Sequence, residues 1–251
     1  MQTIVLATQK GGSGKSTLAV NLAVSAQEHG LTVRLIETDP QGTLSSWQRR
    51  RNFGSPLVES VGNATRLEQQ LAIFASENVG LTIIDTPSGI STLTNAAIRH
   101  TDLCLIPVRP SMLDIEAAAP TLGTARAART SFGFILNHAT VRGRRMESAE
   151  AALADEAALE LGDILARPYI GMRSDHQDAL ARGMAVTEYA PAGKAADEIR
   201  QLWRWVSDKL ARAADGDRST GIDRAWRDLE PKAHWATSTG RASLPHRFRD
   251  F

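Results

Sequence analysis

Short apolar runs alternate with stretches of helical periodicity from Thr3 to about Ala213. Continuous apolar runs are typical of strands buried on both faces, and helical stretches between them are typical of crossovers in a parallel sheet. The predicted strands lie near residues 3–8, 32–36, 80–84, 103–108 and 132–137, with a short one near 168–170. The predicted helices lie near 15–29, 42–51, 64–77, 90–99, 112–129, 147–161, 175–182 and 193–213. Pro120 should kink or break the helix near 112–129.

This alternation predicts an α/β fold with a doubly wound, mostly parallel sheet and helices on both faces. Right-handed crossovers bring the loops that follow the strands to one edge of the sheet, where ligands of doubly wound folds bind. Candidate functional residues are therefore those that directly follow each predicted strand.

A glycine-rich turn, QKGGSGKST at residues 9–17, joins the first predicted strand to the first predicted helix. Glycines allow a tight turn in which successive N–H groups and a helix N-terminus face a phosphate chain. Lys15 would reach the β- and γ-phosphates, Ser16 would bind Mg²⁺, and Thr17 is a weaker candidate for a phosphate contact. The rest of the predicted nucleotide loop is Gly11, Gly12, Ser13 and Gly14.

Two carboxylates also follow predicted strands. Asp85 ends the apolar segment LTIID and, combined with the glycine loop, is interpreted as a Walker B residue that binds Mg²⁺ through water. Asp39 lies in ETDPQG just after the second strand, and the alternative for this residue is a helix cap or a turn before proline.

Together these segments resemble the ParA/MinD family of deviant Walker ATPases, whose glycine motif is KGGxxK[ST] and whose second strand leads into DxDPQG. The run IPVRPSxLDIEAA, residues 106–118, resembles the plasmid-partition branch, small proteins without an N-terminal DNA-binding domain. The resemblance covers residues 1–213. It implies a P-loop NTPase fold of the deviant Walker type, with ATP and Mg²⁺ as ligands, and slow ATP hydrolysis stimulated by a partner.

The resemblance also implies roles for individual residues in catalysis. Lys10 would cross a dimer interface to the partner's nucleotide and would act there with Lys15. Asp39 would orient the attacking water or hold Mg²⁺ through its hydration shell. Glu37 stands where the family motif has its first Asp, and this departure leaves the role of Glu37 open.

Further along the chain, Asn137 lies at the end of the predicted strand 132–137, where the family has an Asn that pairs with adenine. A turn-forming Asn is the alternative. The segment around Ser111 and Asp114 lines the dimer interface in the family, although either residue could simply cap a helix.

The C-terminal part resembles ParA proteins in its order of a helix, a glycine, a strand end at Val186–Tyr189 and a final helix. In that family, basic residues near the start of the last helix bind DNA non-specifically. Lys194 matches that position best, and the nearby candidates are Arg173, Arg182 and Arg200. The resemblance thus implies a homodimer on nucleoid DNA in the cytoplasm, with a ParB-like or cargo-adaptor partner and no stable membrane association.

Composition narrows these expectations. The 251 residues carry 29 Lys and Arg against 28 Asp and Glu, a formal net charge of +1, so DNA contacts must come from a local patch. The one cysteine, Cys104, cannot form an intramolecular disulfide and does not suffice for the family's iron–sulfur branch. Residues 214–251 are polar, broken by Gly and Pro, and are predicted to form a flexible tail after the domain 1–213.

Two other classes of protein remain open at this stage. The last helix is amphipathic and basic, which also fits a MinD-type regulatory ATPase on a membrane surface. A metabolic P-loop enzyme, such as a ligase or small-molecule kinase, is the third possibility, but Lys10 has no clear use in it.

Overall fold

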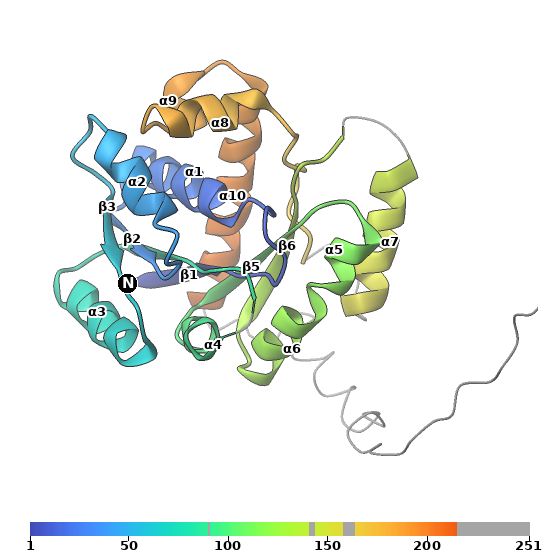
Figure 1. Ribbon diagram of the computed structural model, residues 1–251, viewed down its shortest axis with the longest axis horizontal. Coiled ribbons are helices and arrows are strands. Elements are labelled where there is room, and N and C mark those ends of the chain that lie inside the picture. Colours follow the sequence, from blue (N-terminus) through green and yellow to red (C-terminus); the bar gives the residue numbers. More distant parts are fainter. Residues whose placement is uncertain (90, 141–143, 158–163, 215–251) are drawn as a thin grey trace, which may run out of the picture. The chain divides into compact units, whose positions relative to one another are not determined.

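The computed structural model describes residues 1–89, 91–140, 144–157 and 164–214 (Figure 1). The chain divides into two units, Met1–Asp215 and Gly216–Phe251. Apart from Ala214, the predicted tail 214–251 lies outside the described residues.

A six-stranded sheet forms the centre of the first unit. Its strands are β1 (Gln2–Leu6), β2 (Val33–Glu37), β3 (Leu57–Ser60), β4 (Leu81–Asp85), β5 (Leu103–Val108) and β6 (Ser131–Leu136). Their order is β3-β2-β4-β1-β5-β6, and every pairing is parallel. The predicted class, a doubly wound parallel α/β sheet, is confirmed.

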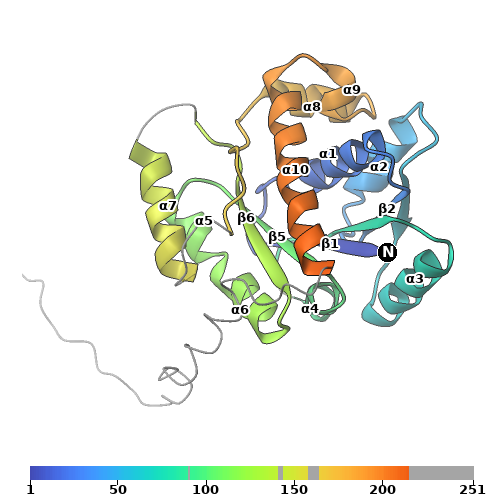
Figure 2. The same ribbon diagram turned by 180° about the vertical axis from the view of Figure 1, so that it is seen from behind.

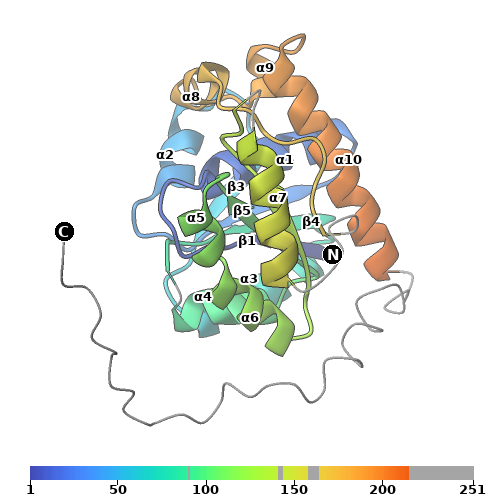
Figure 3. The same cartoon turned by 90° about the vertical axis from the view of Figure 1, so that its right-hand side faces the viewer.

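Helices cover both faces of this sheet. They are α1 (Lys15–Glu28), α2 (Thr43–Arg50), α3 (Ala64–Ser76), α4 (Thr92–Arg99), α5 (Met112–Glu116), α6 (Ala119–Ala127), α7 (Arg144–Ala157), α8 (Ser174–Ala181), α9 (Val186–Tyr189) and α10 (Lys194–Ala214). Figures 1 and 2 show α10 beside α1, and Figure 3 shows α4 and α6 on the opposite side of the strands.

Two hydrophobic clusters correspond to these two faces. In β1, Ile4 and Leu6 pack with α1, α2, α8, α9 and α10, whereas Val5, and Ala7 just after the strand, face the side of α3 to α7. Successive strand residues point to opposite faces, so a strand covered on both sides needs apolar residues at every position. This requirement explains why β1, β4 and β5 were readable as continuous apolar runs.

Three local expectations were wrong. The sheet has the extra strand β3, whose residues are exposed or half-buried at the edge and therefore form no apolar run. No strand forms at 168–170. Single bridges lie on either side of this segment, from Leu165 to Phe134 and from Gly171 to Ala139. Val186–Tyr189 is helix α9 rather than a strand end, because the Glu188 carboxylate accepts a hydrogen bond from the Ala185 N–H at 2.8 Å and closes a helical turn.

The predicted break at Pro120 is present. Helix α5 ends at Glu116, and α6 begins at Ala119 with the proline in its first turn, where a missing N–H costs no helical hydrogen bond.

Candidate nucleotide site

The carboxyl ends of β1, β2 and β4 are tied together at one edge of the sheet. The Thr38 N–H and hydroxyl both donate to the Asp85 carbonyl, at 3.0 and 2.8 Å. The Thr86 hydroxyl donates to the Leu6 carbonyl at 2.8 Å. These contacts hold the loops after three neighbouring strands close to one another.

The glycine loop has the backbone geometry of a phosphate cradle. Gly12 and Gly14 have φ angles of 72° and 92°, in the left-handed region that favours glycine. A Cβ at Gly14 would also overlap the Asn137 amide nitrogen, so this position excludes side chains twice over. Helix α1 begins at Lys15, directly after the loop, and no side chain caps its N-terminus, which is the end of a helix that favours a phosphate.

Ser16 and Asp85 form a pair that fits Mg²⁺. The Ser16 hydroxyl donates to Asp85 Oδ2 at 2.5 Å. Asp85 is fully buried, and its Oδ1 has no hydrogen-bond partner among the described residues. Mg²⁺ binds oxygen ligands and usually takes only one or two carboxylates together with phosphates and waters, so this oxygen pair is a suitable protein contribution.

Charge at the site is strongly affected by burial. Burial raises the pKa of Asp85 to about 7, against the opposing effects of the Ser16 hydrogen bond and the Lys15 charge. Burial likewise lowers the pKa of Lys15, while the negative charges of Asp85 and Asp39 oppose that shift. Lys15 and the two carboxylates therefore lie close enough to interact electrically.

Ser88 is a site residue that the sequence pattern did not single out. The Lys15 ammonium donates to the Ser88 hydroxyl at 3.4 Å. Its place just after Asp85-Thr86-Pro87 was the only available signal, because a serine in a loop has no pattern of its own.

Glu37 and Asp39 occupy different environments. Glu37 is buried, and its carboxylate accepts from the Leu44 N–H at 2.5 Å, from the Ser45 N–H at 3.2 Å and from the Ser45 hydroxyl. It therefore caps the first turn of α2, where a negative charge is favourable. Asp39 is half-buried and accepts from the Gln41 N–H at 2.9 Å in a turn.

Lys10 contacts the carboxylate of Asp114, which lies in α5 after strand β5. Its ammonium lies 3.2 Å from Asp114 Oδ2, while Arg109 Nε donates to Oδ1 at 2.8 Å and the Ser111 hydroxyl donates to Oδ2 at 2.5 Å. Burial alone would raise the pKa of Asp114, but the hydrogen bonds from Ser111, Arg109 and Lys10 hold it below its usual value. Ser111 also caps α5, so the capping interpretation of this segment and its contact with the glycine loop both apply.

Asn137 lies against the glycine loop. Its amide nitrogen donates to the Ser13 carbonyl at 2.7 Å, and its amide oxygen accepts from the His138 N–H at 2.9 Å. An Asn amide has a second N–H and a second lone pair, and these are the groups left for an adenine contact.

The four predicted DNA-binding residues belong to the α8–α10 region, which Figure 1 shows as one group of helices next to α1 and α2. Arg173 forms a two-point ion pair with Glu198, at 3.1 and 2.5 Å, and Arg200 pairs with Asp197 at 3.1 Å. Arg182 is exposed and stacks over the Tyr189 ring at 4.8 Å, and Lys194 is exposed at the first position of α10. Arg182 and Lys194 are therefore the more available cations, since Arg173 and Arg200 already have acidic partners.

The parallel sheet and the glycine loop between β1 and α1, with a Ser–Asp pair beside it, define a P-loop nucleotide-binding protein. Residues 4–186 match the family model described as the CobQ/CobB/MinD/ParA nucleotide binding domain. The chain belongs to this family.

Several curated relatives match most of the chain. The chain is 27% identical over 211 residues to the maintenance of carboxysome distribution protein A of Halothiobacillus neapolitanus, covering 80% of this chain and 94% of the relative. It is 25% identical over 251 residues to the chromosome-partitioning ATPase Soj of Thermus thermophilus, covering 85% of this chain and 98% of the relative.

Solved structures support the fold. The MinC:MinD cell division protein complex of Aquifex aeolicus matches with a TM-score of 0.70 at 19% identity, covering 83% of this chain and 96% of that one. An ATP complex of Cyanothece McdA matches with a TM-score of 0.66 at 19% identity, covering 84% and 96%.

Proposed function

We propose that the protein is a ParA-type ATPase that dimerises when it binds ATP, binds DNA without sequence preference and positions a cargo in the cell. The observation that carries this proposal is the second lysine of the glycine loop. Lys10 contacts Asp114 beyond the loop, whereas Lys15 lies among Asp85, Asp39 and Ser88. Lys10 therefore lies apart from the phosphate site of its own subunit, and in a dimer a phosphate of the second subunit would replace Asp114 as its anionic partner.

The residues divide the chemistry of ATP hydrolysis among them. Lys15 and the N–H groups of the loop bind the β- and γ-phosphates, and Lys10 of the second subunit adds positive charge there. Ser16 and Asp85 hold Mg²⁺, which neutralises phosphate charge when it is bound. Asp39 orients the water that attacks the γ-phosphate in line with the leaving oxygen. Asn137 keeps the loop in place and contacts adenine.

DNA binding is assigned to the exposed cations of α8–α10. Lys194 and Arg182 supply direct phosphate contacts. Arg173 and Arg200 are secondary candidates, because Glu198 and Asp197 already neutralise their charges. Two copies in a dimer double these contacts, which makes DNA affinity depend on ATP. A ParB-like or cargo-adaptor protein then stimulates hydrolysis and releases the dimer from the nucleoid, in the cytoplasm. The names of the two relatives, a carboxysome-distribution protein and a chromosome-partitioning ATPase, support cargo positioning in general.

The structure favours this proposal over a MinD-type membrane ATPase. The apolar face of α10 is buried in the core of the protein through Ile199, Leu202, Trp203, Val206 and Leu210. A helix whose apolar face is already covered has no such face left to insert into a lipid surface. Among the described residues no helix is long and apolar enough to cross a membrane.

The test combines ATP turnover, oligomeric state and DNA binding in the purified wild-type chain. Light scattering should show a dimer with ATP and Mg²⁺ and a monomer with ADP. A DNA mobility shift on duplexes of unrelated sequence should appear with ATP and weaken steeply as salt rises. Turnover that requires an added metabolite would instead indicate a metabolic enzyme, and ATP-dependent sedimentation with anionic vesicles but not with DNA would indicate the membrane class.

A further inference from the structure

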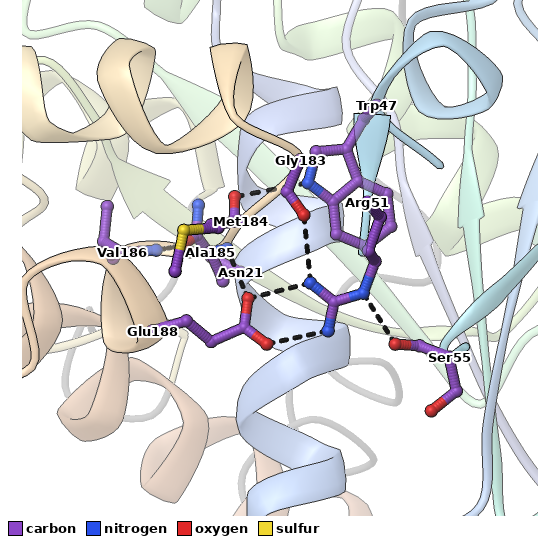
Figure 4. A network of polar contacts seen from close by, with 9 residues as sticks. All are labelled: Asn21, Trp47, Arg51, Ser55, Gly183, Met184, Ala185, Val186 and Glu188. Atoms are coloured by element: carbon purple, nitrogen blue, oxygen red, sulfur yellow. Dashed lines mark hydrogen bonds and ion pairs between the residues drawn. The ribbon is translucent and has the colours of Figure 1, made fainter. Parts of the chain in front are cut away.

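A buried polar network joins the end of α2 to the segment 183–188 (Figure 4). Its centre is Arg51, whose guanidinium donates to both carboxylate oxygens of Glu188, at 2.8 and 2.7 Å. The same group donates to the Gly183 carbonyl at 3.0 Å and to the Ser55 carbonyl at 2.6 Å. The Arg51 side chain is 3% exposed and lies over the Trp47 ring at 4.8 Å.

The segment 183–188 is also held through its backbone. The Trp47 indole N–H donates to the Met184 carbonyl at 3.2 Å, and the Val186 N–H donates to the Asn21 amide oxygen at 2.8 Å. Gly183 has a φ of 68°, and a Cβ there would overlap the backbone of Arg50. Segment 183–188 is therefore in direct contact with both α1 and α2.

Both of these helices begin at the predicted nucleotide site. Helix α1 starts at Lys15, and Asn21 is linked back to its first turn because the amide N–H donates to the Thr17 carbonyl at 2.7 Å. The first turn of α2 is capped by Glu37 and follows the turn made by Asp39. The glycine loop and the turn at Asp39 are therefore joined directly to the two helices that contact segment 183–188.

The other end of the segment leads to the exposed cations. Gly183 directly follows Arg182, and α9 packs against α10, which begins at Lys194. The position of segment 183–188 therefore sets how Arg182 and Lys194 lie relative to α1 and α2.

We infer that Arg51 is a positioning residue that couples the nucleotide state of the loops at the sheet edge to the placement of the α8–α10 surface. The Arg51–Glu188 pair makes both of its hydrogen bonds only in one relative orientation of the two side chains. A shift of α2 would therefore either move Glu188 with it or break a buried ion pair, which is costly. The nucleotide part of this inference rests on the proposed function, whereas the mechanical part rests on the contacts alone.

Hydrogen–deuterium exchange with and without ATP and Mg²⁺ tests the coupling without reference to DNA. In the wild type, ATP should change the exchange rates of the backbone amides of residues 184–189. In Arg51→Lys, which keeps the charge but loses the planar fork, this ATP-dependent difference should disappear while the difference at the glycine loop remains. A purely structural role would speed exchange equally in both nucleotide states.

Arg50→Lys is the matched control, because Arg50 is adjacent and exposed and reaches only the Leu180 carbonyl in segment 180–188, at 3.4 Å. It should keep the full ATP-dependent difference. Glu188→Gln provides a second variant with the same volume should Arg51→Lys fold poorly. An unchanged exchange pattern at 184–189 in the wild type on adding ATP overturns the inference whatever the variants do, as does a normal difference in Arg51→Lys.

DNA binding supplies the second readout. The ratio of DNA affinity with ATP to that without ATP should fall by about fivefold or more in Arg51→Lys, the size of a typical coupling between sites, with ATP affinity little changed. If the wild type binds no DNA but shows the exchange difference, the proposed function fails and the coupling stands.

Discussion

Glu37 and Asp39 are two residues apart at the end of β2, yet their carboxylates contact different parts of the molecule. Glu37 binds the N–H groups of the first turn of α2, whereas Asp39 binds only one N–H of its own turn and lies within electrical reach of Lys15. The environment of each carboxylate, and not its place in the motif, therefore indicates its role. At position 37, where the family motif has Asp, the Glu side chain contacts the first turn of α2.

Separate variants of these two residues should separate stability from catalysis. Glu37→Ala should lower the free energy of unfolding by about 1–3 kcal/mol, because it leaves buried N–H groups without an acceptor. Asp39→Ala should cost little stability but slow ATP hydrolysis by at least about tenfold, with ATP binding and dimerisation intact. Urea denaturation and steady-state turnover measure the two effects. Undiminished partner-stimulated turnover in Asp39→Ala would eliminate Asp39 as the water-orienting residue.

Asp85 should make the stability of the nucleotide-free protein depend on pH. Burial raises its pKa in the folded state to about 7, well above the pKa of an exposed aspartate. Between these values the folded protein binds more protons than the unfolded chain, so the contribution of Asp85 to stability falls as pH rises. Asp85→Asn removes this term, and its melting temperature relative to the wild type should rise between about pH 5 and pH 8. If the difference in melting temperature between Asp85→Asn and the wild type stayed constant across this pH range, the raised pKa of Asp85 would be contradicted.

At the scale of elements, the strands and helices with strong local signals were predictable and the others depended on tertiary contacts. Strands β1, β4 and β5 are apolar at nearly every position because helices cover both faces. Strand β3 is at the sheet edge and carries no such signal. Helix α9 has the β-branched pair Val186 and Thr187, yet the contact of Asn21 with Val186 and that of Arg51 with Glu188 hold it as a helix.

The candidate site shows the same division. The closeness of Ser16 and Asp85 could be expected from the sequence, because a glycine motif specifies its own backbone and the carboxyl ends of parallel strands meet at one edge. Their proposed role in binding Mg²⁺ stays a prediction. The Lys10–Asp114 contact joins residues 104 positions apart, and the capping role of Glu37 depends on how α2 leaves the loop. No periodicity or spacing in the sequence encodes contacts of that kind.

The exposed lysine at the start of α10, Lys194, allows a prediction about the salt dependence of DNA binding. If Lys194 contacts phosphate in both subunits of a dimer, Lys194→Ala removes two contacts. The slope of the logarithm of DNA affinity against the logarithm of salt concentration should then fall by up to about 2, with ATP binding preserved. A mobility-shift series in rising salt measures the slope, and Arg200→Ala serves as a comparison because Arg200 already pairs with Asp197. An unchanged slope for Lys194→Ala would place the DNA contacts elsewhere.

The whole molecule contains one lysine more in its nucleotide loop than a single phosphate site requires. In this chain the Lys10 ammonium and Arg109 both form ion pairs with the Asp114 carboxylate. This carboxylate stays ionised because its pKa is lowered. Use of Lys10 in hydrolysis therefore calls for a second subunit that offers a stronger anion. A triphosphate is such an anion, since it carries several negative charges at one place.

Lys10→Gln should therefore retain ATP binding as a monomer and lose the ATP-dependent dimer, together with most of the turnover and of the ATP-dependent DNA binding that follow from dimerisation. Lys15→Gln is the contrasting variant, because it removes the cation of the subunit's own site and should lose ATP binding as well. Fluorescent-nucleotide titration measures ATP binding, and light scattering with ATP and Mg²⁺ measures dimerisation. A normal ATP dimer from Lys10→Gln would show that Lys10 has no role across the interface, and its contact with Asp114 would then be a structural ion pair within one chain.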